Sequence, residues 1–172
     1  MNILVWDRLI RCFHWFTAAS FLINYFIIED GNIHEWLGYG VAFGLLIRFI
    51  WGFVGSKHAR FSDFFPTPKR VFNYIKGMLK GEPEHTIGHN PLGSIMVLLM
   101  MIGLTGITLT GWFMTLDMFW AVPWPEEVHD LLANAVMALV AVHVSAVLFY
   151  DIILKQGLIR AMITGKKSVS DH

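Results

Sequence analysis

Two histidines, His129 and His143, stand fourteen residues apart in the last long apolar stretch of the chain. Because an α-helix turns by 100° per residue, this spacing falls about 40° short of four full turns, and both imidazoles project from nearly the same helix face. The helical rise separates them by roughly 21 Å, most of the way across a hydrocarbon core about 30 Å thick. Ionisable groups at that depth are costly and indicate a functional site with a partner group. The spacing therefore predicts one nitrogen ligand toward each side of a membrane.

Two further histidines lie at matching depths. His14 is near the start of the first apolar stretch, and His34 opens the second. Alternating helix directions pair His34 with His129 at one side of the membrane and His14 with His143 at the other. One mismatch remains, because His14 is about 8 Å from its helix start while His143 is about 16 Å from the end of its stretch. This mismatch in depth disappears if the fourth helix extends beyond the membrane.

The elements that would position these histidines are membrane-spanning helices. The chain has 172 residues, of which 55% are hydrophobic and 15% charged, and its mean hydropathy is +0.54. These values lie outside the usual range of soluble domains. Four apolar stretches are long enough to span a bilayer, at about residues 9–28, 36–54, 92–114 and 128–154. They are too long for barrel strands, so the sequence predicts an all-α integral membrane protein, a four-transmembrane-helix bundle with a single domain over residues 1–172.

Basic residues predict the orientation of this bundle. Segments 29–35 and 115–128 contain no Lys or Arg, and all thirteen basic residues lie near the N-terminus, within 48–80 or after residue 154. The positive-inside rule then places both termini and the central loop in the cytoplasm, with the protein in the bacterial inner membrane. The net charge of zero hides this asymmetry, and we expect no nucleic-acid partner.

Residues 68–80 predict a short cytoplasmic amphipathic helix between the second and third spans. Pro68 stands near its start, as is common in helices. Apolar residues follow an i, i+1, i+4, i+7, i+8 pattern, and basic residues fill four of the eight other positions. The apolar set is Val71, Phe72, Ile75, Met78 and Leu79. We interpret this segment as a helix on the membrane surface without a recognition role.

The ligand chemistry favours haem at both histidine pairs. Zinc usually takes three or four ligands, and no acidic residue lies at the depth of His14 or His143. The single Cys12 excludes an internal disulfide, covalent haem attachment and a thiolate cluster. Haem iron needs only two axial side chains, so the pairs predict two b-type haems with bis-histidine ligation, a closed arrangement suited to electron transfer. Taken singly, each histidine would more often be a hydrogen-bonded packing residue.

Two runs of glycines have two interpretations. The runs are Gly38, Gly40, Gly44 and Gly103, Gly106, Gly111. Both are spaced for close approach of two helices, which would also permit a homodimer. In a bundle that holds a large planar cofactor, they would equally make room for its ring.

Four motifs follow one another along nearly the whole chain. They are WDRLIRCFHW at 6–15, HEWLGY at 34–39 with LIRFIWG at 46–52, GHNPLG at 88–93, and the pair His129 and His143. Together they resemble the prokaryotic cytochrome b561 family, whose superfamily includes the b-type cytochrome subunits of nickel hydrogenases. The resemblance implies a diheme, quinone-linked electron carrier, with His14, His34, His129 and His143 as the haem ligands.

Three other residues are candidates for the cofactor sites. Arg11, one turn before His14, would pair with a propionate of the inner haem, and Arg48 would pair with the neighbouring propionate. Their alternative role is to flank helices at the positive side of the membrane, which is the favoured one for Arg48. His89 is either a loop histidine, the favoured interpretation, or part of a quinone or propionate site. Glu35 stands where family members often carry a basic residue, which would alter the surroundings of the outer haem.

We expect transmembrane electron transfer between a quinone pool and a redox partner through these two haems. Quinone oxidoreductase activity of the chain itself stays open. The alternative is a haem-bearing membrane anchor that recruits and connects a partner oxidoreductase, and a histidine-lined proton or metal transporter is disfavoured. The outer edge is acidic and the inner edge basic, so the inner haem should have the higher reduction potential.

Overall fold

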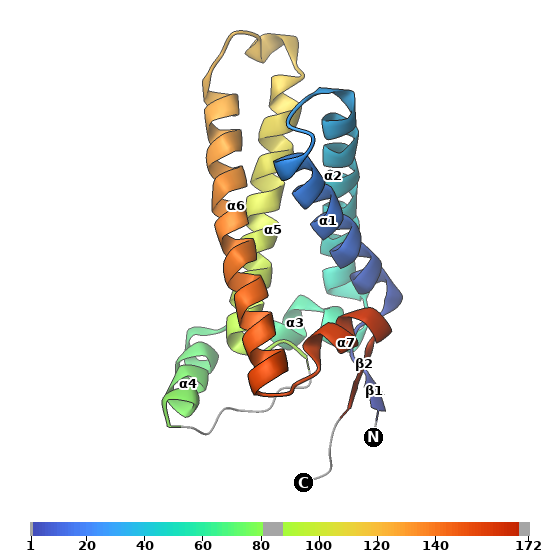
Figure 1. Ribbon diagram of the computed structural model, residues 1–172, viewed down its shortest axis with the longest axis vertical. Helices are drawn as coiled ribbons and strands as arrows, with labels where there is room; N and C mark the ends of the chain where they lie inside the picture. The colour runs from blue at the N-terminus through green and yellow to red at the C-terminus, as the bar shows by residue number, and fades with distance from the viewer. Residues whose placement is uncertain (1, 81–87, 169–172) are drawn as a thin grey trace.

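The computed structural model describes residues 2–80 and 88–168, and most of them are helical. Its body is formed by four long helices, shown in Figure 1. They are α1 (Arg8–Phe26), α2 (Gly31–Val54), α5 (Pro91–Met114) and α6 (Trp124–Leu148). A π-helical turn, Phe149–Ile153, continues α6. The four predicted apolar stretches are therefore helices.

Three helices among the described residues are long and apolar enough to cross a membrane. They are Gly31–Val54, Pro91–Met114 and the 30-residue helix Trp124–Ile153, which includes the π-helical turn. The 19 residues of α1 are less apolar because they include Arg11, His14 and Asn24. The protein is thus a helical membrane protein, and the fourth span stays a prediction.

The helices pack in the order α1 on α2, α2 on α5, and α5 on α6. Their shared core contains Val41 and Leu45 from α2, Leu104 from α5 and Val136 from α6. Because α6 packs mainly on α5, while α1 packs mainly on α2, contacts between α1 and α6 depend on a few side chains. One such contact is the hydrogen bond that the Tyr25 hydroxyl donates to Oδ1 of Asn134, at 2.7 Å.

The glycines are mostly used for close helix packing within the chain. A Cβ added at Gly103 would lie 2.5 Å from Cγ2 of Val136, and one added at Gly106 would lie 2.7 Å from Cδ1 of Leu132, so α5 and α6 approach closely. Gly40 and Gly44 face side chains of α1, Phe16 and Phe13. These four glycines face partners inside this chain, which removes the support that they lent to a homodimer.

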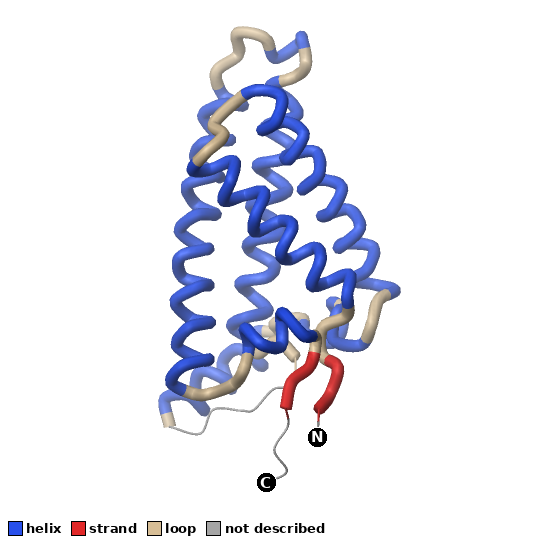
Figure 2. The backbone as a smooth tube through the Cα atoms, turned by 45° about the vertical axis from the view of Figure 1, so that its right-hand side comes forward, coloured by secondary structure: helices blue, strands red, loops and turns tan. Residues whose placement is uncertain are grey.

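The first and last described segments meet at one end of the bundle. Strand β1 (Asn2–Leu4) pairs antiparallel with β2 (Lys166–Ser168), as Figure 2 shows. The short helices α3 (Phe61–Phe64), α4 (Pro68–Leu79) and α7 (Leu158–Thr164) lie at the same end. We call this the basic end, since it carries residues 2–11, 48–80 and 155–168, which include all thirteen Lys and Arg residues.

Helix α4 matches the predicted helix of the central loop to within one residue. Tyr74 is buried and its hydroxyl lies 3.2 Å from that of Tyr150, which ties α4 to the end of α6. Phe72, Ile75 and Leu79 are exposed, Leu79 by 85%. The predicted apolar stripe therefore points away from the bundle, and its placement on a membrane surface stays a prediction.

Candidate functional site

The structure brings the four predicted histidines together in two pairs. His14 of α1 faces His143 of α6, with 6.3 Å between the ring centroids and 54° between the ring planes. His34 of α2 faces His129 of α6, with 6.1 Å and 50°. Helix α6 therefore contributes one ring to each pair, at two depths of the bundle.

These separations suit a metal ion held between the two rings of each pair. A metal–imidazole bond of about 2.0 Å, and roughly 1.1 Å from nitrogen to ring centroid, place two opposite imidazoles about 6.2 Å apart. No cluster of three or more His, Cys, Asp or Glu suited to a metal ion occurs in residues 2–80 and 88–168. Each pair thus offers two ligands, which fits an iron already held in plane by four porphyrin nitrogens.

Hydrogen bonds fix the rings of His34 and His129, called the outer pair after the side of the membrane predicted for it; His14 and His143 are called the inner pair. Nδ1 of His34 donates to the carbonyl of Ile28 at 2.8 Å, and Nδ1 of His129 donates to the carbonyl of Ile107 at 3.0 Å. The hydroxyl of Thr110 lies 3.2 Å from the same His129 nitrogen. A carbonyl can only accept, so both rings carry their proton on Nδ1 and leave Nε2 free to bind a metal.

Neighbouring residues also help to position the rings of His34 and His129. The Asn24 side-chain amide donates to the His34 carbonyl at 3.0 Å, which anchors the start of α2 to α1. A Cβ added at Gly111 would lie 3.2 Å from Cε1 of His129, so the glycine makes room for that ring. A Cβ added at Gly38, one turn after His34, would meet nothing within 4 Å. Gly111 therefore makes room for a ring of this chain, whereas Gly38 fits the alternative interpretation, in which glycines leave room for a cofactor ring.

The inner pair lacks this set of hydrogen bonds. Nδ1 of His14 is buried and has no hydrogen-bond partner within the described residues. The ring of Trp15 packs edge-on against it, with centroids 5.0 Å apart. The two pairs thus share their ring separation but differ in the groups around their nitrogens.

A buried cation lies in the same half of the bundle as the inner pair. Arg48 is only 3% exposed, and its Nη1 has no hydrogen-bond partner in the part of the chain that the structure describes. Its guanidinium lies 5.2 Å from the ring centroid of Phe61 and 6.0 Å from that of Phe64. An unpaired buried guanidinium nitrogen is costly, so this nitrogen is open to an acceptor from outside the described residues.

His89 lies in the loop before α5, where aromatic rings enclose it. Its ring centroid is 4.5 Å from that of Trp6 and 4.8 Å from that of Phe64. Burial, followed by the positive charge of Arg48, lowers the pKa of His89 to about 3. Its buried Nδ1 has no partner among the residues described. His89 is therefore a neutral ring with a free hydrogen-bonding position. The sequence offered it as a loop histidine or as part of a quinone or propionate site, but no local pattern indicated its burial.

The charge of Asp7 acts on Arg48, but the Asp7 carboxylate is already engaged. It caps α1 by accepting from the Ile10 amide at 2.9 Å, and it accepts from Trp51 Nε1 at 2.8 Å and the Ser56 hydroxyl at 2.6 Å. Burial raises the pKa of Asp7, but these hydrogen bonds together bring it below its usual value. The carboxylate therefore stays ionised while it ties the start of α1 to the end of α2.

Arg11 is directed toward the C-terminal segment. Its Nη1 donates to the carbonyl of Ile163 in α7, and a Cβ added at Gly165 would lie 3.3 Å from its Nε. That Nε is buried and has no hydrogen-bond partner in the described residues. Arg11 therefore anchors α7 to α1, and its predicted pairing with a propionate has less structural support than that of Arg48.

The chain is similar to membrane cytochromes over almost its whole length. The profile of the family described as prokaryotic cytochrome b561 matches residues 5–165. Three similar proteins are each named probable Ni/Fe-hydrogenase B-type cytochrome subunit. The Azotobacter vinelandii protein is 25% identical, with 97% of this chain and 89% of that protein covered. The Rhodobacter capsulatus protein is 25% identical (99% and 83% covered), and the Cupriavidus necator protein is 26% identical (90% and 72% covered). No solved structure gives a significant match.

Proposed function

Since the chain belongs to the prokaryotic cytochrome b561 family, we propose that it carries electrons across a membrane through two b-type haems, one at each histidine pair. Membership establishes the coarser statement, a membrane cytochrome that transfers electrons through haem b. The observation that supports two haems is the ring separation, which at 6.3 Å and 6.1 Å suits bis-histidine ligation in both pairs.

Each histidine has a defined part in this proposal. When bound, a haem supplies an iron that gains or loses one electron at a time. His14 and His143 would hold the inner iron, and His34 and His129 the outer one. Two imidazoles at each iron would leave no position open for oxygen. The hydrogen bonds from His34 and His129 to carbonyl groups fix the orientation of these two rings.

Arg48 and His89 would receive a carboxylate of the inner haem. The unpaired Nη1 of Arg48 and the unpaired Nδ1 of His89 support this role, because both are buried polar atoms that require a partner. The partly buried carboxylate of Asp7 is already held by Trp51, Ser56 and Ile10, and that of Asp63 by His58. The role predicted for Arg11 is the same, with the weaker support described above.

The surroundings of the two pairs support a higher reduction potential at the inner haem. A ring that donates from Nδ1 to a carbonyl is a more basic ligand and stabilises oxidised iron, which lowers the potential at His34 and His129. The buried guanidinium of Arg48 favours the reduced, less positive iron at the inner pair. Hydrogen bonding and charge therefore act in the same direction.

The proposed partners are a quinone pool and a redox enzyme subunit. The relatives are named as B-type cytochrome subunits of Ni/Fe-hydrogenases, which favours a redox enzyme as the second partner of this chain too. The positive-inside rule favours the basic end on the cytoplasmic side of the bacterial inner membrane. The alternative, a haem-bearing anchor, predicts that the purified chain alone is inert toward quinol, whereas the main proposal predicts quinol oxidation.

The experiment that tests the haem assignment is a haem count on four variants, His14→Ala, His143→Ala, His34→Ala and His129→Ala. We expect two low-spin haems per wild-type chain and one in each variant, with both variants of a pair losing the same spectroscopic centre. His58→Ala is the matched control, because His58 pairs with Asp63 at 3.1 Å and belongs to neither pair. A single haem in the wild type, or His143→Ala and His34→Ala losing the same centre, would contradict the assignment.

A further inference from the structure

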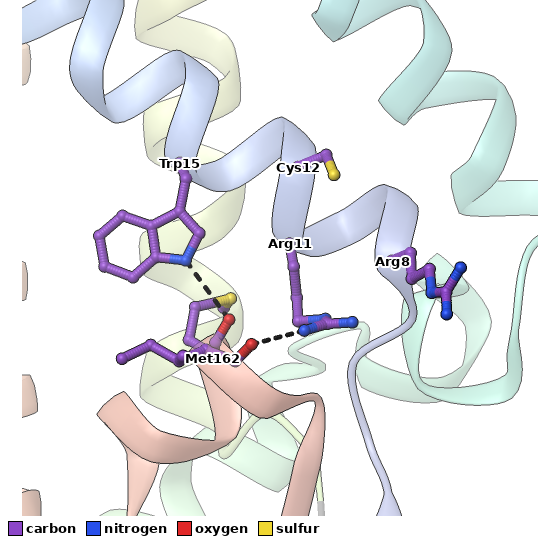
Figure 3. A pocket seen from close by; sticks show the side chains of 6 residues that line it. Arg8, Arg11, Cys12, Trp15 and Met162 are labelled. Atoms are coloured by element: carbon purple, nitrogen blue, oxygen red, sulfur yellow. Dashed lines mark hydrogen bonds between the residues drawn. The ribbon is translucent and has the colours of Figure 1, made fainter.

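A pocket of about 360 Å³ opens on the outward side of α1 at the basic end of the bundle. Figure 3 shows this pocket from close by, with α7 forming one wall. Its lining consists of Arg8, Arg11, Cys12, Trp15, Met162 and Ile163. The four residues from α1 follow an i, i+3, i+4, i+7 pattern, so they form one continuous helix face. Of these lining residues only Arg11 has a role in the haem proposal, and Arg8, Cys12 and Trp15 have none.

A second hollow, of about 350 Å³, adjoins the first along the groove between α1 and α2. The two hollows share Cys12, and the second is lined by apolar side chains that include Phe13, Phe16, Phe43 and Ile47. From Arg8 to Phe16 the helix rises by about 12 Å. Together the hollows form a groove with two guanidinium groups at its mouth and a hydrophobic channel along the helices.

The two cations at the mouth lack a counter-charge among the residues that the structure describes. Arg8 and Arg11 stand in the first turns of α1, close to the positive end of the helix dipole, where cations are unfavourable. The first turn of α1 contains no acidic residue, and the carboxylate of Asp7 is engaged elsewhere. The guanidinium of Arg8 has no hydrogen bond or ion pair with any other residue in the described ranges 2–80 and 88–168. An anion bound from outside the chain would stabilise these two cations.

The rim of the groove has the chemistry of a membrane interface. The indole nitrogen of Trp15 donates to the carbonyl of Met162 at 3.4 Å, while about half of the side chain stays exposed. Tryptophan at this position is typical of the headgroup level of a bilayer, with its polar nitrogen toward the headgroups. A ligand in the groove would thus have a polar group at the interface and an apolar tail in the membrane.

We propose that this groove binds one anionic phospholipid, with its phosphate between Arg8 and Arg11 and one acyl chain along α1 and α2. Two cations and an apolar channel match the two parts of such a lipid. A free inorganic phosphate would leave the channel unused, and the neutral head of a quinone would leave both guanidinium groups without an anion. Anionic charge and an acyl chain are therefore both required.

The test is native mass spectrometry of the delipidated holoprotein with added phosphatidylglycerol or phosphatidylcholine. We expect one phosphatidylglycerol to be retained per chain and phosphatidylcholine to bind at least tenfold more weakly. Arg8→Gln should weaken phosphatidylglycerol binding at least tenfold. Cys12→Trp, which fills the junction of the hollows without touching the charges, should do the same. Arg60→Gln is the matched control, an exposed arginine of the same end that lies outside the groove.

Several outcomes would overturn this assignment. Equal retention of both lipids, or equal losses in Arg8→Gln and Arg60→Gln, would show that only general surface charge is involved. Displacement of phosphatidylglycerol by millimolar inorganic phosphate would indicate a simple anion site, and displacement by a long-chain quinone would reassign the groove. An unchanged haem spectrum and thermal midpoint in every variant would show that losses of lipid do not come from unfolding.

Discussion

Replacing Gly111 by Ala should alter the outer haem through direct contact with its ligand. The added Cβ would lie 3.2 Å from Cε1 of His129 and 3.5 Å from its Nδ1, and ordinary contact begins at 3.4 Å. The ring must therefore move by a few tenths of an ångström. Because Nδ1 donates to the Ile107 carbonyl at 3.0 Å, the same movement lengthens or bends this hydrogen bond.

The size of the effect follows from the energy of that bond. A hydrogen bond of this kind contributes about 0.5 to 1.5 kcal/mol net, and weakening it can remove at most this amount. A ring that donates less strongly is a less basic ligand, so it stabilises oxidised iron less and the potential rises. For a one-electron centre, this energy corresponds to a rise of about 20 to 60 mV in the outer potential, with the inner potential unchanged.

The assay is a redox titration of both haems by absorption and electron paramagnetic resonance. Gly106→Ala is the control, since its Cβ would lie only 2.7 Å from Cδ1 of Leu132. It strains the contact between α5 and α6 more strongly than Gly111→Ala does but does not touch a ligand. If Gly106→Ala shifted the outer potential as much, separation of the helices would be the cause. If Gly111→Ala left the outer potential unchanged or shifted the inner one, the reasoning would be refuted.

Two other variants test the groups at the basic end. Arg48→Gln removes the buried positive charge and should lower the inner potential by on the order of 50 mV, without changing the outer one, in the same titration. Asp7→Asn removes the charged acceptor of Trp51 and Ser56 and should lower the free energy of unfolding by about 1 to 2 kcal/mol. The folded-state pKa of Asp7 lies below its unfolded value of 3.8. The stabilisation is therefore complete above that value and is lost as the pH falls through the folded-state pKa, so the thermal midpoints of variant and wild type should converge in acid.

The histidine pairs could be predicted because helical geometry and membrane thickness fix them. A rise of about 1.5 Å per residue sets the depth of a side chain, and alternating helix directions set which depths coincide. His14 meets His143 and His34 meets His129 for this reason. The boundaries of α4 were equally accessible, since Pro68 and the apolar spacing are local signals.

The surroundings of the inner pair could not be predicted, because they depend on contacts between distant segments. His89 is enclosed by Trp6 and Phe64, residues from the N-terminal segment and the central loop. The pairing of β1 with β2 joins segments more than 160 residues apart and leaves no periodic pattern in either. The glycine runs were ambiguous for another reason. A missing side chain gives the same signal whether a helix or a cofactor fills the space. The surroundings separate the two cases, since Phe16 lies against Gly40 and no atom lies within 4 Å of a Cβ built at Gly38.

The two sources of redox asymmetry act on different pairs, so they can be separated by experiment. His129 and His143 lie roughly 21 Å apart along α6, and changes at sites so far apart usually add. The double variant Gly111→Ala, Arg48→Gln should raise the outer potential and lower the inner one, and narrow the gap by about 70 to 110 mV. If the double variant narrows the gap between the two potentials by less than either single variant does, the two sites are coupled. A gap that widens would show that the hydrogen bond or the buried charge acts with the opposite sign.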